Sequence, residues 1–177
     1  YRWYLWVFRS PSTVVYKLDE SRSSKVPLAH FGPLREGILS VDRYSSYKAL
    51  AKRSHIILAI CWSHVRRDFW GIARDWPQQE NWAFEWIGEI ATLYHLNRLR
   101  LAEQAQSEAW TQQDRGLRAA MDQMVQKCDA QLAQKDLHPA CKKVLESLKN
   151  HWPGLIVFVD HPEVPMDNNE AERLERL

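Results

Sequence analysis

Asp42 and Glu172 are the two residues of this chain whose positions best suit metal-assisted chemistry. Asp42 ends the short apolar run 37–41, and open α/β sheets carry working residues at the carboxyl ends of their strands. Glu172 lies one turn into an expected helix, with Asp167 a suitable N-cap and Glu170 its capping-box partner. Two or three carboxylates can hold Mg²⁺, which keeps its other positions for water and phosphate oxygens. Such ions can activate the attacking oxygen and stabilise the leaving oxygen in phosphodiester cleavage and strand transfer.

Taken singly, each acid has a simpler explanation. Asp42 fits an ordinary turn or helix-capping acid. Glu172 fits a surface pair with Arg176, which lies four residues further along and would contribute roughly 0.2–0.5 kcal/mol. The metal-site interpretation therefore depends on the two acids meeting across a sequence separation of 130 residues, from 42 to 172. An insertion that leaves one core and returns to it would allow this.

The elements that must position these acids are predicted from their apolar patterns. Residues 1–18 alternate β-favouring side chains around Ser10-Pro11-Ser12, which is typical of a β-hairpin with proline in its turn. Both faces of its first strand are apolar, which favours a central position in a sheet. The runs 37–42, 47–53 and 56–60 have the pattern of strand, helix and strand, which predicts a parallel unit and an α/β class with a mixed sheet.

A helical region separates this part of the chain from the end that carries Glu172. Residues 78–152 keep helical spacing of apolar side chains through three segments, which predicts a small all-α bundle. Pro153-Gly154 is expected to end the bundle, and the apolar run 155–159 to form a strand that returns to the core. We therefore expect a first core part, 1–77, the helical insertion, 78–152, and a second core part, 153–177, with the return strand and the last helix.

Basic residues gather in the first half of the chain. Residues 1–75 hold 13 Lys/Arg and 6 Asp/Glu, whereas residues 76–177 hold 11 and 16. This asymmetry indicates a polyanion partner, although an uneven surface without a partner explains it about as well. Basic side chains neutralise phosphates without reading sequence. The expected DNA contacts are the cationic residues after Asp42, with His64, and the polar neighbours of Glu172: Arg43, Lys48, Lys52, Arg53, His64, Arg66, Arg67, Asn168, Asn169 and Arg173.

The cysteines do not form a convincing zinc or disulfide pattern. Cys61 and His64 have the spacing of half a zinc site, but Cys128, His138 and Cys141 lie in helical stripes and supply no matching pair. Cys61 is better explained as a buried residue, and His64 as a hydrogen-bonded or phosphate-facing one. An odd number of cysteines indicates a reducing compartment. No apolar run approaches the roughly 20 residues of a membrane helix, and no secretion leader is evident.

Four segments together carry a family resemblance: 3–10, 41–47, 61–69 and 167–173. The most specific are Cys61-Trp62-x-His64-x-Arg66-Arg67 and Asp167-Asn168-Asn169-x-Ala171-Glu172-Arg173. In this order they resemble the central DDE domain of IS66-family transposases, over nearly the whole chain.

The resemblance implies a ribonuclease H-like core with an all-α helical insertion before the last catalytic helix. It implies Asp42 as the second catalytic acid and Glu172 as the last, holding Mg²⁺, or Mn²⁺ in its place. The implied partners are DNA, as transposon ends and target, a second copy of the chain, and accessory proteins of the same element, with no membrane. The implied location is the bacterial cytoplasm, at the nucleoid.

Two departures from the family accompany the resemblance. The family's first acid lies in an Asp-Glu-Thr motif ahead of the hairpin, and none is present in these 177 residues. Asp19-Glu20 precedes Ser21 and follows the hairpin, so it is not a substitute. Arg43 stands where the family usually has glycine, bringing bulk and charge beside the expected metal.

Three function hypotheses follow. The first is a DDE transposase catalytic domain that cleaves and joins DNA with Mg²⁺, and that is inactive or nearly so as this 177-residue chain. The second is a non-enzymatic remnant whose salt-sensitive DNA binding does not depend on the two acids. The third is a helical interaction module that dimerises through its bundle, which sedimentation at several concentrations would test.

Overall fold

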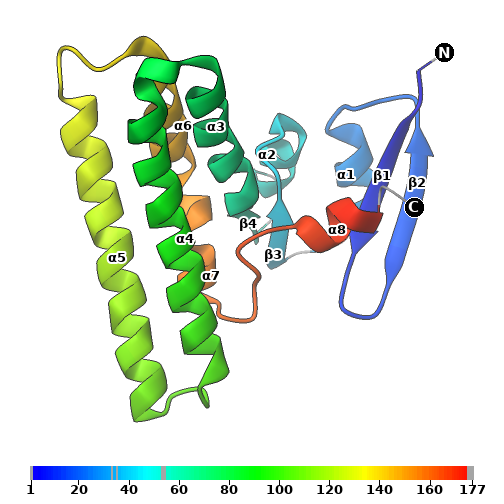
Figure 1. The fold of residues 1–177 in the computed structure, drawn as a ribbon. Helices are drawn as coiled ribbons and strands as arrows, with labels where there is room; N and C mark the ends of the chain where they lie inside the picture. Colours follow the sequence, from blue (N-terminus) through cyan, green and yellow to red (C-terminus); the bar gives the residue numbers. More distant parts are fainter. Residues whose placement is uncertain (1, 33, 35, 53–54, 175–177) are drawn as a thin grey trace.

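The computed structural model describes residues 1–177 except residues 1, 33, 35, 53–54 and 175–177. The elements in chain order are β1 (Tyr4–Arg9), β2 (Val14–Asp19), α1 (Lys25–Phe31), β3 (Glu36–Val41), α2 (Ser45–Ala51), β4 (His55–Ile60), α3 (Trp62–Asp75), η1 (Pro77–Gln79), α4 (Glu80–Ala102), α5 (Glu108–Leu132), α6 (Pro139–Leu155), α7 (Val157–Asp160) and α8 (Asn169–Leu174). Figure 1 shows the long helices on the left, the parallel strand pair with α2 in the middle, and the hairpin with α1 on the right. The short α8 lies between β3 and the hairpin.

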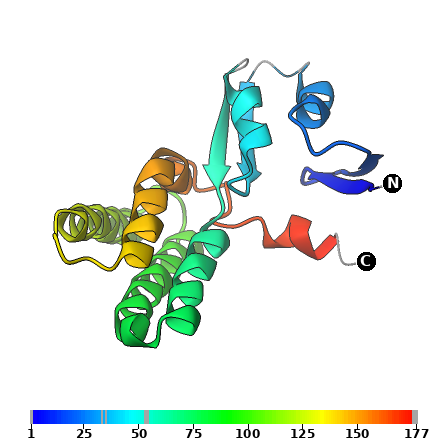
Figure 2. The same cartoon turned by 90° about the horizontal axis from the view of Figure 1, so that it is seen from above.

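The described strands form two separate two-stranded sheets. β1 and β2 pair antiparallel, with Tyr4 opposite Asp19, whereas β3 and β4 pair in parallel, with Glu36 opposite His55. The predicted α/β class, hairpin and parallel unit are thus confirmed. A single mixed sheet is not formed by the described residues, and β1 pairs there with β2 alone, so the predicted central position of this strand is not observed. Figure 2 shows the hairpin apart from the parallel pair.

The hairpin is held by an aromatic cluster rather than by the other sheet. Trp6 and Phe8 of β1 are buried with Val26 of α1. The ring of Tyr47, from α2, meets Trp6 edge-on at 6.2 Å between centroids. A two-stranded sheet alone is marginal in water, so this packing against two helices keeps the hairpin in place.

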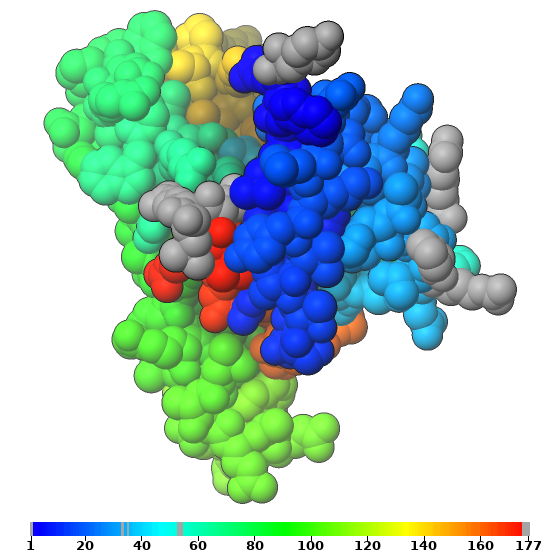
Figure 3. Space-filling model, turned by 90° about the vertical axis from the view of Figure 1, so that its right-hand side faces the viewer, coloured from blue at the N-terminus to red at the C-terminus, as the bar shows by residue number. Residues whose placement is uncertain are grey.

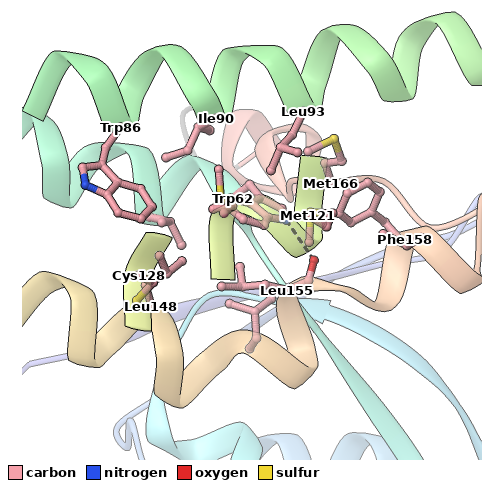
Figure 4. Close-up of a cluster of buried hydrophobic side chains, with 14 of the residues drawn as sticks. Trp62, Trp86, Ile90, Leu93, Met121, Cys128, Leu148, Leu155, Phe158 and Met166 are labelled. Atoms are coloured by element: carbon pink, nitrogen blue, oxygen red, sulfur yellow. Dashed lines mark hydrogen bonds between the residues drawn. The ribbon is translucent and has the colours of Figure 1, made fainter. Parts of the chain in front are cut away.

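The three predicted helices of the insertion are confirmed as α4, α5 and α6. Their apolar stripes bury one continuous core with α3, as Figure 4 shows. Trp62, at the first turn of α3, is fully buried in this core, and its Nε1 donates a hydrogen bond to the carbonyl of Leu155 at 2.9 Å. The bundle therefore packs directly on the helix that follows β4. No helix in the described ranges combines the length and apolar character needed to cross a membrane.

The predicted return strand at 155–159 is wrong. The structure continues α6 through Pro153 to Leu155 and follows it with the helical turn α7. A short apolar run looks the same in a buried helix and a buried strand, and here helical packing against the bundle prevails. Gly154 does not end the helix: a Cβ at this residue would lie 2.5 Å from Ile60 Cγ1 and 2.9 Å from the Leu58 carbonyl oxygen. Its missing side chain lets α6 approach β4 closely.

A buried arginine fixes α7 to the bundle. Arg100, in α4, is fully buried and donates to Asp114 at 2.7 Å and Asn97 at 2.8 Å. The same guanidinium donates to the carbonyls of Phe158 and Val159, both at 2.8 Å. These bonds satisfy backbone groups at the end of the insertion, where the chain turns back toward the strands.

Candidate metal and nucleic-acid site

Asp42 follows directly after β3, at the end of the parallel sheet. Its Oδ1 accepts a hydrogen bond from the backbone N–H of Tyr44 at 2.8 Å, which holds the carboxylate at the start of the loop. The carbonyl of Val41 accepts from the N–H of Cys61 at 3.0 Å, so the loops after β3 and β4 begin side by side. This is the edge at which parallel sheets carry functional side chains, as predicted for Asp42.

The segment before α8 is tied to the start of α3 by two backbone contacts. The carbonyl of Met166 accepts from the N–H of Trp62 at 2.9 Å, and the N–H of Asn168 donates to Cys61 Sγ at 3.4 Å. Met166 is itself buried in the main core (Figure 4). The first turn of α8 is thereby brought to the end of the parallel sheet.

A third contact ties the same segment to the insertion. The hydroxyl of Tyr94, in α4, donates to Asp167 Oδ2 at 3.0 Å. Burial of Tyr94 and the neighbouring Asp167 carboxylate both raise the pKa of the phenol, which stays a donor. Asp167 Oδ1 accepts from the N–H of Asn169 at 3.1 Å, so Asp167 supports the helix start from one position earlier than predicted.

Asp42 and Glu172 line one cleft of about 430 Å³. Glu172 lies between two side chains of α3: its Oε1 is 3.4 Å from His64 Nε2, and its Oε2 is 3.8 Å from a guanidinium nitrogen of Arg67. The other lining residues come from β1, β3, α2 and the α8 segment: Val7, Ser40, Val41, Tyr47, Asn168 and Ala171. Figure 3 shows α8 reaching the surface beside the hairpin, with the green helical surface on its other side.

Cys61 is the buried thiol of this region. It precedes α3, and its side chain is fully buried. Burial raises the pKa of the Cys61 thiol, and the backbone N–H groups of Asn168, His64 and Ser63 act in the opposite direction because they favour the thiolate. One ligand atom each from Cys61, His64 and Glu172 lies within 4.8 Å of the others.

The residues predicted to contact DNA occupy several environments. His64, Arg67 and Asn168 line the cleft. Four other side chains are exposed: Lys48, Lys52, Arg66 and Arg173. Asn169 is half-buried at the start of α8. Arg53 lies outside the described residues, as does Arg176, the alternative partner of Glu172. DNA contact stays a prediction for the whole set.

Arg43 has three internal partners. One terminal nitrogen donates to Asp68 at 2.5 Å and to Ser147 at 2.9 Å, and the other donates to the carbonyl of His64 at 3.1 Å. The side chain, only 19% exposed, therefore links the loop after Asp42 to α3 and α6. Arg43, at the position for which the resemblance implies a glycine, therefore makes internal contacts in this chain.

The sequence interpretation missed the residues that carry the end of the chain back to the cleft. Tyr94 falls within the helical spacing of residues 78–152, and nothing in that spacing marks its hydroxyl as a partner of Asp167. Arg100 offered a clearer signal, since a charged residue lies three positions after Asn97 on the apolar face of α4. A polar pair on such a face indicates a buried network.

The fold and cleft define an α/β domain that is interrupted by a long helical bundle and holds two distant acids at the junction. A family model described as the transposase IS66 family matches residues 1–176, so the chain belongs to the IS66 transposase family. All four segments that carry the resemblance contribute residues to this cleft.

Two relatives from Sinorhizobium fredii (strain NBRC 101917 / NGR234) are similar to the chain. The protein named "Uncharacterized protein y4jD" is 30% identical over 179 residues, covering 95% of this chain and 33% of that protein. The protein named "Uncharacterized protein y4qI" is 37% identical over 70 residues, covering 36% of this chain and 13% of that protein. The chain thus spans about a third of the length of the first relative. No solved structure matches the chain.

Proposed function

We propose that this chain is the catalytic domain of a DDE transposase with a ribonuclease H-like core, in which Asp42 and Glu172 are two of the metal-binding acids. The observation that supports this most strongly is their shared cleft, because it unites residues 130 positions apart. In a family of transposases, such a cleft suits cleavage and joining of DNA strands. The implied location is that of bacterial DNA, at the nucleoid.

The donors in the cleft fit a hard divalent cation. Both acids are half-buried and offer carboxylate oxygens, which Mg²⁺ and Mn²⁺ prefer. The chemistry that a bound Mg²⁺ supplies is activation of the attacking oxygen and stabilisation of the leaving one. Asp42 and Glu172 would hold the ion, with Asp42 already oriented by the N–H of Tyr44.

The cationic side chains around the cleft would hold the DNA backbone. Arg67 has a side chain that is 64% exposed and reaches toward Glu172, so it can contact a phosphate at the cleft. Lys48, Lys52 and Arg66 extend this cationic surface along α2 and α3. Contacts of this kind set the position of a duplex without reading its sequence.

A groove between the two sheets suits a further strand that carries the first acid. It has a volume of about 290 Å³, and successive residues of both β1 (Val7–Arg9) and β3 (Ile38–Val41) line it. Each of these strands pairs on one edge only in the described chain. A strand in the groove would join the two sheets into one and end near Asp42. The resemblance puts the Asp-Glu-Thr strand ahead of the hairpin in chain order, and we propose that such a strand would occupy this groove.

Metal binding tests the proposal without requiring turnover. Mn²⁺ should bind the 177-residue chain, as measured by electron paramagnetic resonance of the free ion, and Mg²⁺ should displace it. Asp42→Asn and Glu172→Gln should each weaken binding by about tenfold or more, since even supporting residues of metal sites cost this much. Glu170→Gln is the matched control, because it changes an exposed carboxylate of the same helix that pairs with Arg9.

The outcome for DNA separates the remaining hypotheses. If Asp42→Asn leaves Mn²⁺ affinity unchanged and DNA binding stays salt-sensitive, the chain is a nucleic-acid-binding remnant and the proposal fails. Strand cleavage and transfer by the 177 residues alone should be absent or nearly so. Robust activity that Asp42→Ala abolishes would contradict the need for a further acid while supporting the assignment of Asp42.

A further inference from the structure

Cys61, His64 and Glu172 form a second candidate ligand set at the cleft. Cys61 immediately precedes α3 and His64 lies in its first turn, so both residues belong to the same end of this helix, and His64 lines the cleft. Glu172 reaches them from α8, with its Oε1 3.4 Å from His64 Nε2. One ligand atom from each residue lies within 4.8 Å of the other two. Asp42 does not belong to this set.

We propose that Cys61, His64 and Glu172 bind a borderline-soft divalent transition-metal ion such as Zn²⁺. Zinc takes sulfur, imidazole nitrogen and carboxylate oxygen as ligands, and its bond lengths put neighbouring ligand atoms of a tetrahedral site about 3–4 Å apart. The separation of His64 and Glu172 is already in this range. The sulfur needs to move by only about 1 Å at most to match the same geometry.

Backbone N–H groups are directed at the thiol and would help to hold the thiolate once a metal ion replaces its proton. The sulfur accepts a hydrogen bond from the N–H of Asn168 at 3.4 Å and lies at the amino end of a 14-residue helix, where N–H groups point outward. The carboxylate and imidazole come from different elements, so the set is assembled by the fold. This distinguishes it from the Cys-x2-His half-site visible in the sequence alone.

The imidazole has an unused atom. His64 Nδ1 is buried and finds no hydrogen-bond partner among the residues that the structure describes. Coordination through Nδ1 would give this buried atom a partner, whereas coordination through Nε2, the nitrogen that lies 3.4 Å from Glu172, would not. A His64–Glu172 ion pair through Nε2, beside an unrelated buried cysteine, would also leave Nδ1 without a partner among the described residues.

Three protein ligands would leave the fourth position of a tetrahedral ion open, and two of the three, His64 and Glu172, line the cleft. Since Glu172 belongs to both ligand sets, a soft ion bound with Cys61 would remove that carboxylate from the Mg²⁺ site. Zn²⁺ would then weaken Mg²⁺ binding, a consequence that rests on the proposed function. Binding of the soft ion itself does not depend on it.

Cobalt substitution tests the site directly, because Co²⁺ bound to a thiolate gives a near-ultraviolet charge-transfer band that carboxylate and imidazole ligands do not. We expect the band in the 177-residue chain titrated with Co²⁺ under a non-thiol reductant, and its loss when Zn²⁺ is added. Cys61→Ser should abolish it. His64→Gln and Glu172→Gln should weaken Co²⁺ affinity by about tenfold or more.

Two controls make the result specific. Cys128→Ser removes another buried thiol, from α5, and should leave the band unchanged. Asp42→Asn removes the other acid of the cleft and should also leave the band, while it weakens Mn²⁺ binding. The two ligand sets can therefore fail or succeed separately.

Absence of the band at stoichiometric Co²⁺, or its persistence in Cys61→Ser, would overturn the proposal. Circular dichroism of each variant checks that it is folded. If Cys61→Ser does not fold, the His64→Gln variant provides the test instead, since His64 is only half-buried. An unchanged Co²⁺ affinity in His64→Gln would also overturn the proposed site.

Discussion

The helical insertion and the α/β part differ in how far their stabilising contacts reach. In the insertion, long helices bury a continuous core, and the buried charge of Arg100 finds its side-chain partners within 14 residues. The α/β part consists of two small sheets, and its cleft is assembled from β1, β3, α2, α3 and α8. It depends on single hydrogen bonds between distant segments, such as that between Trp62 and Met166.

This difference assigns separate roles to the two regions. Two-stranded sheets are weak by themselves, so the parallel pair relies on α6, which approaches it closely at Gly154. The bundle also supplies Tyr94 to hold the α8 segment. We infer that the insertion provides most of the stability, while the cleft keeps polar groups that a ligand can use. Four substitutions test this comparison, in order of decreasing expected effect.

The largest effect is expected for Arg100→Met, which breaks the buried network of the insertion. The substitution leaves two backbone carbonyls and part of Asp114 without their donor. Breaking a buried ion pair from one side costs about 3–5 kcal/mol. Urea denaturation followed by circular dichroism measures the loss, with the exposed Arg98→Met as the matched control. A cost below about 1 kcal/mol would show that the network is not a main support of the bundle.

The second test adds a methyl group at the contact between the two regions. Gly154→Ala puts a Cβ 2.5 Å from Ile60 Cγ1, so α6 must move away from β4, at a cost of about 1–3 kcal/mol. Gly88→Ala, in the middle of α4, is the matched control because a Cβ there meets nothing within 4 Å. It should stabilise the helix by about 0.5–1 kcal/mol. Equal effects of the two substitutions on the free energy of unfolding would contradict the close packing.

These contacts also show why the sequence predicts some parts of the fold better than others. The stripe that contains Leu117, Met121 and Cys128 predicts α5 correctly, because a long amphipathic helix is determined by local spacing. The run 155–159 is too short for its period to separate helix from strand, and Gly154 is understood only once Ile60 is known to face it. Local patterns therefore predict the insertion well and its junction with the strands poorly.

The residues of the candidate site also divide into those that local sequence patterns predict and those that only the fold reveals. Position in the chain marked both Asp42 and Glu172 as candidates, each with a simpler explanation when taken singly, and the resemblance gave them their roles as second and last acid. Neither indicates that His64 and Arg67 flank Glu172, because that contact joins residues more than 100 positions apart. The bracing role of Arg43 depends equally on α6, through Ser147. Contacts of this range are fixed by the whole fold and leave no local signal.

The third test concerns the bond that holds α8 near the cleft. Tyr94→Phe removes the donor to Asp167 and should cost about 1–2 kcal/mol, the range for one hydrogen bond to a charged group at a half-buried site. Hydrogen exchange should accelerate in residues 167–172 and stay unchanged in α5. Tyr16→Phe, on the exposed face of the hairpin, is the control. Equal exchange in both variants would mean that backbone contacts alone position α8.

The smallest expected effect is the acid sensitivity that Asp114 gives to the insertion. Burial acts to raise the pKa of Asp114, but Arg118 and Arg100 outweigh it, so the folded-state pKa lies below the ordinary value. The unfolded chain then takes up the proton more readily than the folded one. The stabilisation is therefore fully present above the unfolded pKa of about 4 and is lost as the pH falls through the lower folded pKa.

The free energies of unfolding of wild type and Asp114→Asn should converge below about pH 4, whereas the difference for the exposed Asp122→Asn stays small throughout. A gap between wild type and Asp114→Asn that is the same at neutral and acidic pH would mean that the Asp114 charge does not contribute to the network around Arg100.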